Sequence, residues 1–285
     1  MLYLANRIKE YRASKPDRHF LAKSCNHLTY PSHMGFFQAF GLRLGNRAGE
    51  ACGGNNYLPI TVINIAELRK KNLKSLRSLG CDIQDMSSKL AATLTQSTEG
   101  DSYLAVRYSF RELIRNVFEH SGAGELDYCA QHWPAKGISE ISILDTGIGV
   151  REGLKNNPYL SIGTDREALE HCVMPGISGA MFKGVELNPY DRWQNSGYGL
   201  YVASRLGQQA GQFFICSGQT GMLLQGDTIR RYDFPMNGTA LRLRIDVNKL
   251  CDVSASIDRI VNEGEEAAQR IGVSFKSASK ASRFV

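Results

Sequence analysis

One amphipathic stretch, RELIRNVFEHSG at residues 111–122, restricts the folds open to this chain more than any other segment. Apolar residues recur at helical spacing through it and through the residues just before it, which predicts a helix with one face packed on a core. They are Val106, Phe110, Leu113 and Val117. Glu112, Asn116 and His120 form a second, polar row about 100° around the same helix. Because the apolar row already fixes the helix to a core, the polar row is either a solvated face or a face turned toward a ligand.

After this helix the hydrophobic period changes from helical to alternating. Alternating or continuous apolar runs bounded by Gly, Pro and Asn predict β-strands, two of them joined by the turn PAKG into a hairpin. The expected strands are 57–65, 125–133, 138–145, 212–218, 221–227 and 238–246. Further helices are expected over 66–80, 81–96, 165–174, 200–211 and 254–272. The chain is therefore expected to be an α+β protein.

Composition limits the class of protein. With 285 residues, 42% of them hydrophobic and 22% charged, the chain fits one large or two modest soluble domains. No run approaches the roughly 18 apolar residues of a membrane span, and the first residues are charged too early for a secretory signal, which favours the cytoplasm. The net charge is +6, and the basic residues are interspersed with acids rather than clustered, so nucleic-acid binding is permitted but not implied and is not expected. The seven cysteines are scattered without a C-x-x-C pair, so reduced thiols are expected.

Two glycine-containing motifs have a chemical interpretation. Asp145 ends an expected strand in DTGIG, where its carboxylate can accept a hydrogen bond from the amino group of adenine. Gly147 and Gly149 let the backbone pass close to a flat base, and Gly197 and Gly199 open a helix whose free N–H groups suit phosphate.

The polar row of the first helix completes this interpretation. Asn116 offers a neutral oxygen to Mg²⁺, which prefers oxygen ligands. Glu112, one turn earlier, could orient or deprotonate a nucleophile near the γ-phosphate, as a catalytic residue.

This ordered set resembles the ATP-binding domain of the GHKL, or Bergerat-fold, superfamily, which includes DNA gyrase, Hsp90, histidine kinases and MutL. ELIRNVFEH resembles the N-box, DTGIG the first glycine box, NSGYGL the second, and GTALRLRI the terminal Gly-Thr strand, together covering roughly residues 100 to 247. The resemblance implies a two-layer α/β sandwich with a mixed, mostly antiparallel sheet, and a mobile lid within about 150–196. It also implies ATP or ADP with Mg²⁺ as ligands. The expected nucleotide-binding set is Asn116, His120, Asp145, Gly147, Gly149, Gly197, Gly199, Leu200 and Thr239, with Asn116 as the Mg²⁺ ligand.

Departures from the family pattern narrow the expected reaction. Glu119 stands where histidine kinases usually have a basic residue, and no phosphoacceptor H-box is found. His120 followed by a small residue is closer to the anti-sigma-factor serine kinases, which phosphorylate a STAS-type partner. Few residues follow Val247, which argues against the transducer domain of gyrase or MutL.

The expected organisation has a partner-binding or regulatory N-terminal region over 1–98, a smaller α/β unit. The ATP-binding domain is expected over 99–250, and a helix with a flexible tail over 251–285. The expected activity is that of a protein kinase or an ATP-driven switch acting on a protein partner, with a STAS-like protein as the candidate partner and a homodimer as a candidate assembly. The alternative is a nucleotide-sensing module without chemistry. A third hypothesis, a nucleic-acid-associated ATPase, rests only on the isoelectric point near 8.9.

Overall fold

The computed structural model describes most of the chain. The described residues are 1–25, 27–51, 55–75, 77–179, 182, 197–250, 259–260, 262–264 and 266–267, without the side chains of residues 101, 102, 105, 247 and 250. The last part of the expected lid, residues 180–196 except residue 182, and most of the expected C-terminal helix and tail lie outside the described residues. Among the described residues, no helix combines the length and the apolar character needed to cross a bilayer.

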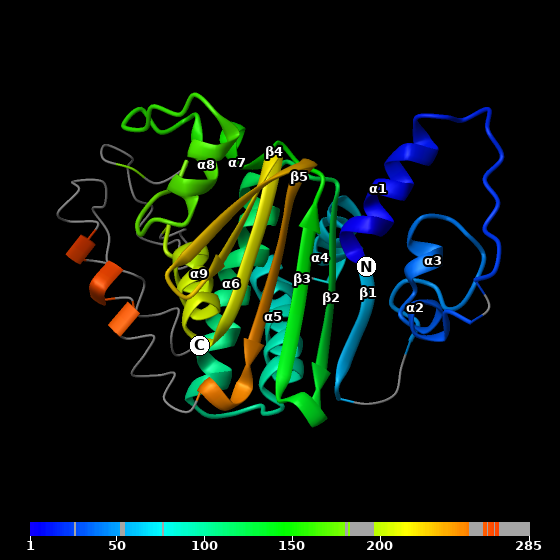
Figure 1. Cartoon of the computed structure of the whole chain (residues 1–285), viewed down its shortest axis with the longest axis horizontal. Coiled ribbons are helices and arrows are strands. Elements are labelled where there is room, and N and C mark those ends of the chain that lie inside the picture. The colour runs from blue at the N-terminus through cyan, green and yellow to red at the C-terminus, as the bar shows by residue number, and fades with distance from the viewer. Residues whose placement is uncertain are drawn as a thin grey trace.

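A five-stranded sheet forms the centre of the molecule, in the spatial order β1-β2-β3-β5-β4 (Figure 1). The strands are β1 (Tyr57–Asn64), β2 (Glu125–Trp133), β3 (Ile138–Asp145), β4 (Gly211–Gln225) and β5 (Thr228–Asp246). Every neighbouring pair is antiparallel. The chain is thus a mixed α/β protein with an antiparallel sheet, and the expectation of a mixed sheet was wrong for the described strands.

The expected strand boundaries in the last part of the sheet also need correction. Three strands were expected between residues 212 and 246, but this segment forms two long strands, β4 and β5, paired as one hairpin. Gly218, which looks like the end of a strand, lies at an irregularity where the β4–β5 register shifts. A bulge lets a strand continue past such a residue with a local bend, so the glycine does not end the strand.

Helices cover one face of the sheet. They are α4 (Ile65–Ser75), α5 (Leu79–Thr95), α6 (Asp101–His120) and α9 (Gly199–Ala210). The helix α6 contacts both α5 and α9, and these two neighbours contact the strands (Figure 1). The expected apolar row of α6 is fully buried in this main core. Short helices α7 (Gly149–Leu154) and α8 (Asp165–Cys172) follow β3 and lie near β4.

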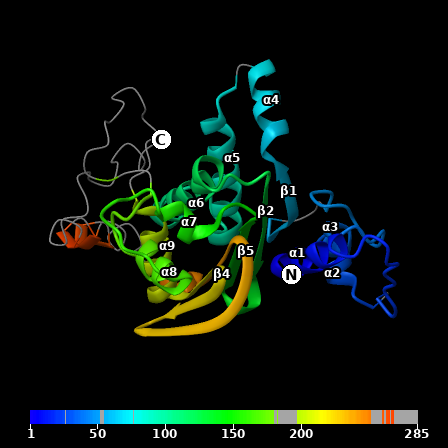
Figure 2. The ribbon, with the colours of Figure 1, turned by 90° about the horizontal axis from the view of Figure 1, so that it is seen from above.

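Part of the opposite face is covered by the N-terminal helices α1 (Leu2–Ala13), α2 (Thr29–His33) and α3 (Phe36–Ala39) (Figure 2). The second apolar cluster joins α1 and α3 to residues that point away from the main core, including Leu144 and Ala240. The alternation of side chains along a strand places these residues on the face opposite to their neighbours Ile143 and Leu241. The architecture therefore has a partial third layer in addition to the expected two.

The sheet and its core continue across the boundary expected at residue 98. β1 pairs with β2 over most of its length, and α5 packs on α6 and on β2. Side chains of α5 belong to the same core as those of α6. Residues 57–95 are therefore built into the same layers as the segment that follows.

This shared core can be tested at Leu90, which has 0% exposure on α5. Leu90→Ala is expected to lower the free energy of unfolding by about 2–5 kcal/mol, because it leaves a cavity between packed helices. Urea denaturation followed by circular dichroism measures this change, and one transition is expected for the whole chain. The exposed neighbour Lys89→Ala is the control, with a change within about 0.5 kcal/mol. A separate early transition that alone responds to Leu90→Ala would contradict a shared core.

Candidate functional site

One cavity brings together most of the polar residues expected to bind a ligand. Its volume is about 310 Å³, and it lies among α6, the turn after β3, α7, residues 177–179, the start of α9, and β5. The expected residues that line it are Asn116, His120, Asp145, Gly149, Gly197, Gly199, Leu200 and Thr239. Glu112 and Gly147, also expected in the site, are not among the lining residues.

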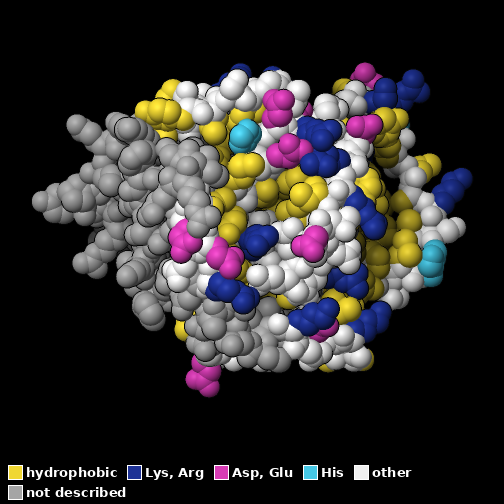
Figure 3. All heavy atoms as spheres, turned by 60° about the vertical axis from the view of Figure 1, so that its left-hand side comes forward, with side chains coloured by type: hydrophobic (Ala, Val, Ile, Leu, Met, Phe, Trp, Pro, Cys, Tyr) yellow, Lys and Arg dark blue, Asp and Glu magenta, His cyan; other side chains and the backbone are white. Residues whose placement is uncertain are grey.

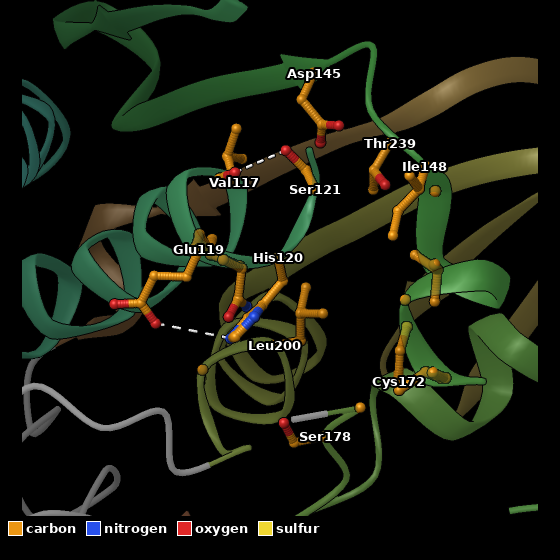
Figure 4. Close-up of a pocket in the computed structure, with 18 of the residues that line it drawn as sticks. Val117, Glu119, His120, Ser121, Asp145, Ile148, Cys172, Ser178, Leu200 and Thr239 are labelled. Atoms are coloured by element: carbon orange, nitrogen blue, oxygen red, sulfur yellow. Dashed lines mark hydrogen bonds and ion pairs between the residues drawn. The ribbon is translucent and has the colours of Figure 1, made fainter. Parts of the chain in front are cut away.

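Asp145 provides a buried carboxyl group at one end of the cavity (Figure 4). It is the last residue of β3 and is paired across the sheet with Thr239 of β5, which lines the same cavity. The backbone N–H of Gly147 donates a 2.8 Å hydrogen bond to Asp145 Oδ1. The side chain orientation is thereby fixed by the turn that follows the strand.

Burial gives this carboxyl group unusual acid–base behaviour. Asp145 has 4% exposure, and burial raises its pKa to about 6, while the Gly147 hydrogen bond acts in the opposite direction. A pKa above that of the unfolded chain means that the ionised carboxylate lowers stability at neutral pH, by about 3 kcal/mol, and that this loss diminishes as the pH falls through 6 toward 4. A carboxylate that lowers stability in a cavity is a candidate for ligand binding.

The two glycines of DTGIG are explained by close packing against the protein. A Cβ on Gly147 would overlap the carbonyl oxygen of Ser121, at the end of α6, and Ile148 N–H donates to that same oxygen at 2.7 Å. Gly149 has a φ of +77°, in the left-handed region that favours glycine. The next N–H, of Val150, donates to Ser217 Oγ at 2.9 Å. Both glycines therefore hold the turn against α6 and β4, and only Gly149 also faces the cavity.

The start of α9 forms another wall of the cavity. Gly197 has a φ of +72° and lies against the backbone of Gly176 and Ile177. Gly199 is the first residue of α9, and a Cβ there would overlap the Cβ of Glu112 on α6. The first N–H groups of a helix have no acceptor within the helix and carry partial positive charge, so this wall suits an anionic group.

Glu112 does not face the cavity, contrary to the role expected from sequence. Its side chain is 2% exposed, and its Oε1 lies 3.5 Å from Arg111 Nη2 and 3.5 Å from Arg115 Nη1. Both arginines are themselves buried. Burial raises the pKa of Glu112, and the two guanidinium groups act against this rise. Glu112 therefore forms a buried ion cluster behind the cavity wall.

Glu119 is the carboxylate of α6 that lines the cavity, although the sequence drew attention to Glu112. Arg115 Nε donates a 2.8 Å hydrogen bond to Glu119 Oε1, so one arginine contacts both glutamates. The other oxygen, Oε2, lies 3.7 Å from His120 Nε2 (Figure 4). Burial lowers the pKa of His120, which favours a neutral imidazole.

The rest of the lining is largely apolar, as in most small-molecule sites. Two members of the predicted core row of α6, Leu113 and Val117, also line the cavity, so that row has two roles. Residues that sequence reasoning did not assign to the site include Ile148, Val150, Leu154, Cys172, Ile177 and Leu241. Alternation along β5, two residues beyond Thr239, could have identified Leu241, while no local signal marks Cys172.

Comparison with known proteins adds no family assignment. No family model, no curated protein and no solved structure matches this chain. The functional conclusion therefore depends on the residues and geometry of the chain itself.

Proposed function

We propose that this chain binds ATP with Mg²⁺ in the cavity between α6, β3 and α9, as a protein with a Bergerat-type fold. The observation that carries the proposal is that Asp145, Asn116 and the start of α9 line one cavity. These groups match a purine amino donor, a hard cation and a polyphosphate, in that order. The volume of about 310 Å³ lies at the lower end of the roughly 300–1,000 Å³ typical of ligand sites.

The arrangement of the elements supports the same proposal. An antiparallel sheet has α6 and α9 on one face, the carboxylate lies at the end of β3, and Thr239 on the paired strand lies beside it. These are the elements on which the N-box, the two glycine boxes and the Gly-Thr strand were expected. On the described part of the face in Figure 3, acidic side chains lie among the basic ones, a surface that does not favour nucleic acid.

The donor set near α6 fits a divalent cation. Asn116 supplies a carboxamide and Glu119 a carboxylate to the same cavity. A bound Mg²⁺ would neutralise phosphate charge and orient the phosphate groups. The chain itself would bind the base at Asp145 and accept the phosphates at the N-terminus of α9.

We propose that the protein uses the bound nucleotide to act on a protein partner. It would do so either by phosphoryl transfer to a STAS-like protein or as an ATP-driven switch. A second candidate, a nucleotide-sensing module without chemistry, is favoured by one observation. Glu112, the expected catalytic carboxylate, is paired with Arg111 and Arg115 and does not line the cavity. In that case ATP binding alone would alter the surface offered to the partner.

Nucleotide binding is expected to depend on Asp145. Asp145→Ala should weaken the binding of ADP at least about tenfold, since it removes a charged hydrogen-bond acceptor, measured by isothermal titration calorimetry. The matched control is Asp127→Asn, because Asp127 on β2 also has a pKa raised to about 6 by burial but does not line the cavity. Equal affinities in the wild type and in Asp145→Ala would refute the site.

The affinity is also expected to depend on pH. With the pKa of Asp145 near 6, its carboxylate is ionised and accepts hydrogen bonds above pH 6, and it is protonated below. Between pH 7.5 and pH 5 the affinity for ADP should therefore fall about tenfold more in the wild type than in Asp145→Asn. Titration of the nucleotide and of other groups affects both proteins alike, so the ratio of the two affinities isolates Asp145. A ratio that does not change with pH would be inconsistent with a role for this carboxylate.

Product analysis separates the two candidate functions. If the protein is a kinase or an ATP-driven switch, ADP should accumulate with Mg-ATP, alone or with a STAS-like partner, and chromatography should detect it. Glu112→Gln should then keep the nucleotide affinity within about threefold, because the Glu112 side chain lies outside the cavity. If Glu112 takes part in the chemistry, the same variant should form no ADP. Recovery of intact ATP from a protein that binds it would favour the sensing module.

A further inference from the structure

Two potential metal ligands face each other at the cavity wall formed by the end of α6. Glu119 Oε2 and His120 Nε2 lie 3.7 Å apart, and both residues line the cavity, as does Asn116. At 3.7 Å the two atoms are too far apart for a hydrogen bond. His120 Nε2 is buried and has no hydrogen-bond partner among the described residues.

The carboxylate of Glu119 is held in position from behind. Arg115 Nε binds its Oε1 at 2.8 Å, and the Arg115 side chain is 3% exposed and fixed in turn by Glu112. The second oxygen, Oε2, is left on the side of His120 (Figure 4). Metal ligands are commonly oriented by such partners behind them, and their loss lowers metal affinity about 10–100-fold.

A nucleotide bound as proposed would need a cation between its phosphate groups and the Glu119 carboxylate. Leu200, at the start of α9 where the phosphates are expected, lines the cavity beside His120 (Figure 4). A carboxylate facing the same cavity would repel a polyphosphate, and a cation between them turns this repulsion into attraction.

We infer that Glu119, His120 and Asn116 form a binding site for a divalent cation, and that this site prefers Mn²⁺ to Mg²⁺. This inference rests on the proposed nucleotide site. Phosphate oxygens of the nucleotide complete the coordination. An imidazole nitrogen is a poor ligand for Mg²⁺, whereas Mn²⁺ accepts nitrogen and oxygen together and stands in the series of metals in which nitrogen ligands raise affinity.

The preference is measured on the full chain with ADP and either ion. Free Mn²⁺ is counted by electron paramagnetic resonance, and Mg²⁺ affinity is obtained from its competition with Mn²⁺. His120→Ala is expected to weaken Mn²⁺ binding at least about tenfold and to leave Mg²⁺ binding within about threefold, which removes the preference. The control is His171→Ala, because His171 on α8 is also partly buried but does not line the cavity.

A second measurement needs no variant and so does not depend on whether His120→Ala folds. Electron spin-echo modulation of the Mn²⁺–ADP complex should show a directly bound imidazole nitrogen in the wild-type protein. ADP binding with no nitrogen signal, or with an equal Mn²⁺ preference in His120→Ala, would overturn this inference and leave the proposed function intact. Failure of ADP to bind with either ion would instead refute the proposed function.

Discussion

The contact between the turn after β3 and the end of α6 determines whether this chain has a site at all. Ile148 N–H donates to the carbonyl oxygen of Ser121 at 2.7 Å, and Gly147 passes so close to that carbonyl that a Cβ would not fit. This bond fixes the carboxyl end of β3 against the C-terminus of α6. It helps to place Asp145 beside Asn116 and His120 of α6, and all three residues line the same cavity. The glycine needed for this packing also supplies the N–H that orients Asp145, so position and orientation have the same origin.

The site contains groups that lower stability in isolation, and the surrounding layers compensate for them. The buried carboxyl group of Asp145 has its pKa raised to about 6, which corresponds to a loss of about 3 kcal/mol at neutral pH. The core that compensates for this loss extends well beyond the segment that carries the motifs. It includes α5 and, through the sheet, β1, both from the first hundred residues. The N-terminal part of the chain therefore contributes, through α5 and β1, to the core that supports the site.

Sequence periodicity predicted most of the elements, because helical and alternating patterns reflect which face of each element is buried. The bounds predicted for the hairpin strands, 125–133 and 138–145, are those of β2 and β3, and the predicted apolar row of α6 is buried in the main core. Gly218 misled the prediction, since a glycine in a bulge and a glycine in a turn look alike in sequence. The spacing of Glu112 and Asn116 places them on one side of α6, but it does not reveal Arg111 and Arg115. The side chains of Arg111 and Arg115 form ion pairs with Glu112. The spacing of the polar residues alone does not predict that these ion pairs hold Glu112 away from the cavity.

The sequence predicted that Glu112 would be the carboxylate of α6 at the ligand. In the structure Glu119 lines the cavity instead, and Glu112 lies in the ion cluster behind it. Moving Glu112 into the cavity would break its ion pairs with two buried guanidinium groups, and breaking a buried pair in this way is destabilising by about 3–5 kcal/mol. Gly199 also lies directly against the base of the Glu112 side chain, which leaves no space for α9 to approach α6 more closely. Glu119 meets no such restriction, because its side chain is 35% exposed and its Oε2 is on the cavity side of Arg115. Any chemistry in the cavity between α6 and the start of α9 would thus have Glu119 as its nearest carboxylate from α6, with Glu112 holding Glu119 in place through Arg115.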